Sequence, residues 1–448
     1  MISTEVEATL RHTPPMTARI SPFAATCMVV ANMIGVGVFT SVGFQIGGLP
    51  SSAPVLALWL IGGVLSLCGA LCYAELVAMM PRSGGEYHLL REAYHPLVGF
   101  MAGWISLVAG FSAPIALAAS AFAKYAQHFG VEMQEQLLAA ALVIFMTAMN
   151  LTNDRWFGRF LGGVTVLKVF LILAFIAGAV FLPGGVHNDL LPKAGDQALY
   201  FSPAFAISLI YVMYAYEGWN GAAYVAGEVQ EPQKNMPRAL ITGTIIVTLL
   251  YVALNAVFLW RAPWDQMANK PEAALIAAQS IFGATGGKFM GFLIAFGLIS
   301  TVASMICAGS RVNERMGEDV PFLKPLAYQN KAGTPVVSVL LVAGMSLLML
   351  LTRTFEEVLR YVECLLVSSS CLAVLAVIWL RIRKPDAPRP FRVPLYPITP
   401  LLFAGMTIYM IWFMAGQHPK ELLAGLATLG VGLAVFAVGT QWQRRKSE

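Results

Sequence analysis

The stretch that decides the fold is Y-V-M-Y-A-Y-E-G-W-N-G-A-A-Y-V-A-G-E-V-Q-E-P-Q-K-N-M-P-R, residues 211–238. An apolar run that begins at Phe201 is long enough to cross a bilayer, yet it holds Glu217, Gly218 and Gly221 near the membrane centre. A glycine in a helix costs about 1 kcal/mol, and a carboxylate at membrane depth costs at least about 2.5 kcal/mol. Backbone leaves helical geometry at that depth only where it is buried in protein or lines a cavity. The stretch therefore predicts a discontinuous helix that lines a site.

The composition places the rest of the chain in a membrane. Of the 448 residues, 58% are hydrophobic and only 12% are charged. The mean hydropathy is +0.69, far above that of an average soluble protein. We therefore expect an all-α integral membrane protein with many spans.

The six cysteines all lie inside apolar runs. They form neither a C-x-x-C metal pair nor an extracellular disulfide framework, so we expect free thiols and no metal site. Because no cysteine lies in a predicted outer loop, we expect no obligatory accessory subunit.

A second interruption lies in the first apolar span, residues 22–48. Gly35 and Gly37 break this span as Gly218 breaks the later one, and the two helices begin with Ser21-Pro22 and Ser202-Pro203. Glycine in a membrane helix often serves close packing instead. Two glycine-interrupted segments in corresponding positions are nevertheless typical of transporters built from inverted repeats, whose binding site lies between the broken helices.

Three motifs resemble one family. Y-A-Y-E-G-W-N at 214–220, Y-A-E-L-x-x-x-x-P-R-S-G-G-E-Y at 73–87 and R-P-F-R-V-P-x-Y-P at 389–397 are similar to segments of the amino acid-polyamine-organocation transporters. The likeness extends over nearly the whole chain and is strongest to the bacterial relatives of the L-type amino acid transporters. Val36 departs from the small polar residue usual in the family's first helix, which removes one hydroxyl from the expected substrate cradle.

The resemblance implies a LeuT-like fold of about twelve transmembrane helices, a five-plus-five inverted repeat with helices one and six broken, followed by two C-terminal helices. The predicted segments are a cytoplasmic tail (1–20), the first repeat (21–182), an outer connecting loop (183–200), the second repeat (201–382), the last two spans with a preceding basic loop (383–440) and a cytoplasmic tail (441–448). With both termini inside, the inner segments hold 20 of the 29 lysines and arginines and the outer segments hold 7. This asymmetry favours a multi-pass protein of the cytoplasmic (inner) membrane with its N-terminus and C-terminus in the cytoplasm.

Lys168 lies about ten residues into the fifth span, too deep for its ammonium to reach water easily. The resemblance implies that it occupies the place of a sodium site in related sodium-coupled transporters, so we expect sodium-independent transport. Two roles remain open for Lys168, a fixed cation that supports the broken first helix and a proton carrier.

The two breaks together describe a site for an α-amino acid. Unwinding at Gly35 frees N–H groups that suit a carboxylate, while unwinding at Gly218 frees acceptors that suit an ammonium. We assign the carboxylate to the backbone of five consecutive residues, Ile34, Gly35, Val36, Gly37 and Val38. We assign the amino group to Tyr214, Ala215 and Glu217, and we expect transport by rocking of one helix bundle against the other.

The role of Glu217 stays open at this point. Its carboxylate can bind a second ammonium, which favours a cationic amino acid or a polyamine, or carry a proton, or bind neighbouring backbone as a structural group. Apolar neighbours favour a neutral substrate.

Other polar groups are secondary candidates. Ser112, Ser300 and Thr301 are possible cavity-lining residues. Glu86 is interpreted as a structural hydrogen-bonding group at a helix end. Arg360 and Glu363 are one turn apart and are expected to pair at the outer surface.

Other classes of function fit the sequence less well. The chain has no H-E-x-x-H, G-x-S-x-G or phosphate-loop motif, so we expect no enzyme, no cofactor and no nucleic-acid partner. The pair of broken helices disfavours a channel. An amino acid sensor without net flux remains the alternative from another class.

Overall fold

The structure is a computed structural model, and it describes residues 20–127, 131–152, 154–331, 333–350 and 355–447. Apart from Ile20, the predicted N-terminal tail lies outside the described residues. The described chain consists of helices and connecting loops, with isolated β-bridges from Ile20 to Val229 and from Gln329 to Pro335. The prediction of an all-helical fold is therefore confirmed for this part of the chain.

The first half of the chain forms ten helical segments: α2 (Pro22–Met33), α3 (Gly37–Gly48), α4 (Ser52–Met79), α5 (Gly85–Ala93), α6 (Pro96–Ile105), η1 (Ser106–Phe111), α7 (Ser112–Gln127), α8 (Glu135–Thr152), α9 (Asp154–Phe181) and α10 (Asp196–Leu199). The second half forms ten more: α11 (Pro203–Tyr216), η2 (Gly221–Glu228), α12 (Pro232–Arg261), α13 (Trp264–Met267), α14 (Ala273–Asp319), η3 (Pro321–Ala327), α15 (Val336–Leu350), α16 (Phe355–Arg383), α17 (Ile398–Gln417) and α18 (Pro419–Ser447).

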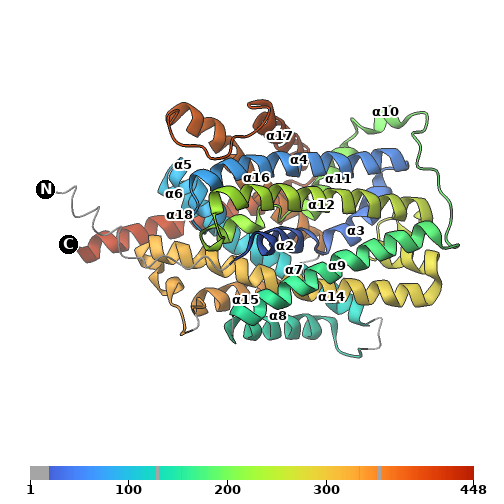
Figure 1. Ribbon diagram of the computed structural model, residues 1–448, viewed down its shortest axis with the longest axis horizontal. Helices are drawn as coiled ribbons and strands as arrows, with labels where there is room; N and C mark the ends of the chain where they lie inside the picture. Colours follow the sequence, from blue (N-terminus) through green and yellow to red (C-terminus); the bar gives the residue numbers. More distant parts are fainter. Residues whose placement is uncertain (1–19, 128–130, 153, 332, 351–354, 448) are drawn as a thin grey trace.

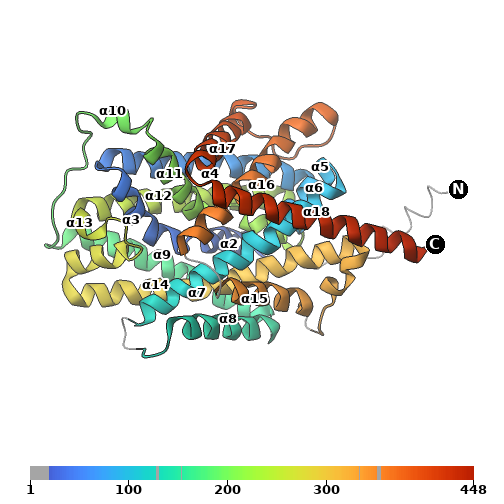
Figure 2. The same ribbon diagram turned by 180° about the vertical axis from the view of Figure 1, so that it is seen from behind.

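The long helices lie side by side along the longest axis of the molecule (Figure 1). Seen from either side, α8 forms one edge of the bundle and α17 lies near the opposite edge (Figures 1 and 2). The short helix α10 lies at one end of the bundle, and α18 ends at the other. A bundle of parallel apolar helices satisfies its backbone hydrogen bonds internally, as a membrane requires.

Nine helical spans among the described residues are long and apolar enough to cross a membrane. Two further apolar helices, within α8 and α15, are shorter than these. The predicted sixth span is also short, because α11 ends at Tyr216, where the sequence turns to Glu217 and Gly218. The structure thus supports a multi-pass helical fold, while the count of about twelve spans and the boundaries of the two repeats stay predictions.

The two serine-proline pairs start their helices in the same way. Ser21 caps α2 by accepting a hydrogen bond from the backbone N–H of Ala24 at 3.2 Å, and Ser202 caps α11 by accepting one from Phe205 at 3.2 Å. Proline follows each serine, where its missing N–H costs nothing. The predicted halves also interleave, since α11 packs against α3 and α12 packs against α2 and α4.

Candidate functional site

The first break lies between α2, which ends at Met33, and α3, which begins at Gly37. Among the described residues, no side chain caps the start of α3, and the N–H groups of a first helical turn have no partner within their helix. Gly35, Val36 and Gly37 line a cavity at this point. A carboxylate in the cavity would meet these N–H donors and the positive end of a helix.

The carbonyl groups freed by the same break are bound by other helices. The Lys168 ammonium on α9 donates to the Ile34 carbonyl at 2.7 Å, and the Tyr251 hydroxyl on α12 donates to the Met33 carbonyl at 2.5 Å. Thr301 on α14 lies 3.3 Å from the same ammonium. Lys168 is only 2% exposed, so these oxygens replace water around its charge.

The second break follows α11 and touches the first. Gly218 has a φ of +106°, which residues with a Cβ rarely adopt, and a Cβ there would lie 2.8 Å from the backbone of Asn32 at the end of α2. A Cβ at Gly37 would lie 2.6 Å from the Cα of Ala215. Glycine therefore permits the two unwound segments to approach each other.

Both breaks open onto this one cavity. Its wall includes many residues predicted from the sequence: Gly35, Val36, Gly37, Tyr214, Ala215, Glu217, Gly218 and Thr301. The remaining lining residues come from α2, η1, α7, η2, α14, α16 and the turn before η2: Asn32, Met33, Gly110, Phe111, Pro114, Ala118, Asn220, Gly221, Tyr224, Met305 and Leu366. The cavity is thus lined by glycine backbone, apolar side chains, the neutral polar residues Asn32, Asn220, Tyr214, Tyr224 and Thr301, and one acidic residue, Glu217.

Three of the predicted substrate and coupling residues lie behind this wall. Ile34 and Lys168 bind each other and support the first break, and Val38 is fully buried in α3. These three residues would therefore affect ligand binding indirectly, because they hold in place the N–H groups that face the cavity.

Ser112 and Ser300 bind their own helices instead of facing the cavity. Ser112 donates to the Leu107 carbonyl at 2.7 Å, and Ser300 donates to the Gly297 carbonyl at 2.7 Å. Serine commonly bonds a carbonyl of the preceding turn in this way. The wide π-helical turn of η1 comes just before Ser112, and its last residue, Phe111, faces the cavity. Of the three possible cavity-lining hydroxyls, only that of Thr301 belongs to a lining residue.

A buried carboxylate supports the cavity from one side. Glu86 on α5 accepts hydrogen bonds from Tyr73 at 2.5 Å, Ser369 at 2.5 Å, Ser370 at 2.8 Å and the Asn220 amide at 3.2 Å. Asn220 itself lines the cavity. The structural role predicted for Glu86 therefore agrees with its contacts, although its link to the site was not foreseen.

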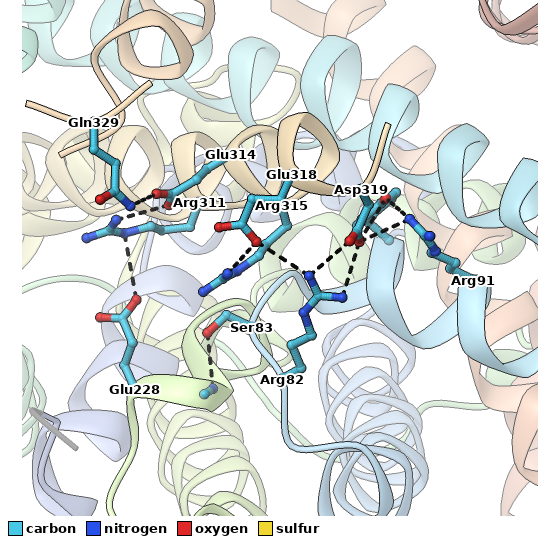
Figure 3. Close-up of polar contacts among 12 residues, drawn as sticks. Arg82, Ser83, Arg91, Glu228, Arg311, Glu314, Arg315, Glu318, Asp319 and Gln329 are labelled. Carbon is cyan, nitrogen blue, oxygen red and sulfur yellow. Dashed lines mark hydrogen bonds and ion pairs between the residues drawn. The ribbon is translucent and has the colours of Figure 1, made fainter. Parts of the chain in front are cut away.

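Ion pairs join the helices at the end of the bundle where α2 begins (Figure 3). Arg82, just before α5, lies 3.0 Å from Asp319 at the end of α14, and Arg91 on α5 lies 3.1 Å from the same carboxylate. Arg311 on α14 lies 3.7 Å from Glu228 at the end of η2. This charged network ties α5 and η2 to α14.

His88 lies on α5 beside the charged network and is 6% exposed. Burial, reinforced by the nearby Arg82 charge, lowers the pKa of His88 to about 4. Its ring is therefore neutral at physiological pH.

The predicted pairing of Arg360 with Glu363 is wrong. Arg360 lies 3.0 Å from Glu421 on α18 and donates to the Tyr211 hydroxyl at 3.4 Å. Glu363 is 1% exposed and faces the interior of the bundle instead. The arginine reaches a carboxylate on another helix, which the spacing along one helix does not reveal.

The architecture defines a class of protein. A multi-pass helical bundle with two interrupted helices meeting at one buried cavity is typical of secondary transporters, which bind their solute near the middle of the membrane. A family model described as "Amino acid permease" matches residues 20–436. The chain therefore belongs to the amino acid permease family, a branch of the amino acid-polyamine-organocation superfamily, and is a multi-pass membrane protein. Its relatives are transporters, which confirms the prediction that it is no enzyme.

Relatives match along most of their length. "Large neutral amino acids transporter small subunit 2" of Rattus norvegicus is 29% identical over 94% of this chain and 80% of its own length. "Serine/threonine exchanger SteT" of Bacillus subtilis is 28% identical over 95% of this chain and 96% of its own. The human "Cystine/glutamate transporter" is 26% identical over 95% of this chain and 86% of its own.

Proposed function

We propose that this protein carries amino acids across the cytoplasmic membrane by alternating access. The observation that carries the proposal is that the uncapped start of α3 and the carboxyl group of Glu217 share one cavity. The first group suits a substrate carboxylate, and the second suits an ammonium. The Tyr251 hydroxyl, which donates to the Met33 carbonyl, also lies 3.0 Å from the Ala215 carbonyl. We assign the main acceptor on the amino side to Glu217.

The side chain of the substrate is less constrained. The apolar neighbours of the cavity, among them Phe111, Met305 and Leu366, favour a neutral amino acid. The second candidate is a cationic amino acid or a polyamine, and Glu217 in the cavity wall favours it. The names of the relatives include neutral and acidic substrates, which supports amino acids as a class and no particular side chain.

We further propose that transport is independent of sodium and works by exchange or by proton coupling. The Lys168 ammonium on the Ile34 carbonyl supports the first part, because it places a positive charge where the resemblance expects a sodium site in related proteins. All six cysteines are free thiols within helices, which supports function without a disulfide-linked accessory subunit. The lysine and arginine count supports both termini in the cytoplasm.

Uptake into proteoliposomes tests the proposal. Purified protein would be reconstituted into empty vesicles and into vesicles preloaded with amino acids, and a mixture of radiolabelled L-amino acids would be added with and without an inward proton gradient. Uptake that requires internal amino acid indicates exchange, and gradient-driven uptake into empty vesicles indicates proton symport. Binding without any uptake would contradict the proposal and favour a sensor.

A further inference from the structure

One buried carboxyl group has no role in the site described so far. Glu363 on α16 is 1% exposed, and neither of its carboxyl oxygens has a hydrogen-bond partner among the described residues. A buried polar group left unpaired costs about 1–3 kcal/mol, and an unpaired buried charge costs much more. Glu363 is therefore neutral in this conformation and carries a proton.

The position of Glu363 on α16 brings it close to the cavity. Glu363, Leu366 and Ser370 are spaced at i, i+3 and i+7, so they share one face of the helix. Leu366 lines the cavity, and Ser370 donates to Glu86. Glu363 thus lies one turn from the cavity wall, on the side away from Glu86.

Among the described residues, no positive charge pairs with Glu363, because Arg360, one turn away on α16, pairs with Glu421. Glu217 and Tyr214 at the end of α11 and Cys364 on its own helix interact with it electrostatically. Other acidic groups on helices packed against α16 have partners elsewhere: Glu75 pairs with Arg381, Glu86 is bound by four donors, and Glu421 pairs with Arg360. Two ionised carboxylates buried within electrostatic reach would repel each other, so Glu217 and Glu363 together retain at least one proton.

A comparison with Glu86 shows that the missing hydrogen bonds of Glu363 are unusual. Both carboxyl groups are buried beside the same cavity, yet one has four donors and the other has none. A purely structural carboxyl is expected to be satisfied, as Glu86 is. An unsatisfied one inside the membrane indicates a group that changes its protonation in function.

We propose that Glu363 and Glu217 form a proton-carrying pair that couples amino acid movement to protons. Glu217 in the cavity wall exchanges a proton with water, and Glu363 holds that proton away from water while the carrier changes its open side. The proton passes between the two carboxyl groups when the change of open side brings them within hydrogen-bond distance, and no bond of the substrate is altered. This inference rests on the proposed transport function.

The test uses full-length protein in vesicles that contain a pH-sensitive dye and receive the same radiolabelled amino acid mixture. In the wild type, we expect an inward proton gradient to raise uptake at least about fivefold and substrate to bring protons inward. Glu363→Gln mimics the protonated carboxyl, so it should keep exchange between internal and external amino acids but lose both proton responses. Glu363→Asp restores a titratable group and should regain proton entry with a shifted pH dependence.

Glu421→Gln is the matched control, because it removes a carboxylate that pairs with Arg360 outside the cavity. It should leave the proton responses intact. Proton-driven uptake that persists in Glu363→Gln would overturn the proposal. So would a wild type that exchanges amino acids without any proton entry, and this measurement holds even if the glutamine variant fails to insert. A wild type with neither uptake nor exchange would instead contradict the proposed transport function.

Discussion

The two breaks are alike in sequence and differ in how they are held. At the first break, side chains from α9 and α12 bind the freed carbonyls of Ile34 and Met33. At the second, the Tyr251 hydroxyl reaches only the Ala215 carbonyl before the turn, and the turn itself takes its shape from the positive φ of Gly218 and its close contact with Asn32 on α2. We therefore expect the two breaks to have different roles. The first break would be a rigid binding site (below, the platform) for a carboxylate, and the second would adapt to the rest of the substrate.

Removal of the positive charge that binds the first break should have the largest effect on uptake. Lys168→Met leaves the buried Ile34 carbonyl without its ammonium donor, which costs about 1–3 kcal/mol, so we expect uptake into preloaded vesicles to fall by up to about a hundredfold. Lys193→Met, in an exposed loop, is the control and should transport normally. Normal uptake by Lys168→Met would show that the platform needs no fixed cation.

Distortion of the second break should have the next largest effect. Gly218→Ala places a Cβ against the Asn32 backbone and strains φ, which together cost about 2 kcal/mol and should reduce uptake by about thirtyfold. Gly195 has a φ of +99° with no atom within 4 Å of an added Cβ. Gly195→Ala therefore tests the backbone strain without any new side-chain contact. Equal losses of uptake in the two variants would refute the role given to the contact between position 218 and Asn32.

A smaller effect is expected at the hydroxyl that touches both parts of the first break. Thr301→Val removes an oxygen that lies 3.3 Å from the Lys168 ammonium and 3.4 Å from the Ile34 carbonyl. Because such hydrogen bonds contribute about 1 kcal/mol or less, we expect a rise of about threefold in the KM for uptake. Ser300→Ala, at the neighbouring position, should leave the KM unchanged because this hydroxyl bonds its own helix. A rise of equal size in Ser300→Ala would contradict the distinction between the lining residue Thr301 and the non-lining residue Ser300.

The smallest effect on transport is expected at His88, away from both breaks. Its pKa of about 4 lies below the ordinary value near 6.5, so the unfolded chain binds more protons between these two pH values. The free energy of unfolding should therefore decrease as pH falls from 6.5 to 4, by at most about 3 kcal/mol. Thermal unfolding in detergent should show this decrease in the wild type and less of it in His88→Gln, while uptake at neutral pH stays the same. A steeper decrease in the variant would contradict the assignment.

Much of the site was predictable because the free-energy costs of a glycine or a carboxylate inside a membrane helix depend only on the local sequence. Glycines and a carboxylate inside an apolar run are costly wherever the run folds, so Gly35, Gly37, Glu217 and Gly218 identified the breaks without any contact information. The serine-proline starts were likewise visible from two adjacent residues.

The remaining parts depend on residues far apart in the chain. Glu86 and Asn220 are 134 positions apart, and Arg82 and Asp319 are 237 positions apart, so no pattern along the sequence joins them. The face of α7 was also difficult to predict, because the π-helical turn of η1 changes the helical register just before Ser112. Arg360 was assigned to a partner on its own helix because the approach of α18 was not visible from spacing.

The eight residues of η2 connect the cavity to the charged network at the end of the bundle. Gly221 at its start lines the cavity, and Glu228 at its end belongs to the charged network. The segment bends at Val225, whose φ of −117° and ψ of 18° are not helical, so η2 is two short turns joined by a hinge between the cavity and the surface. A displacement of Gly221 at the cavity therefore reaches the Arg311–Glu228 ion pair only through the bend at Val225, which makes this residue the hinge between the two.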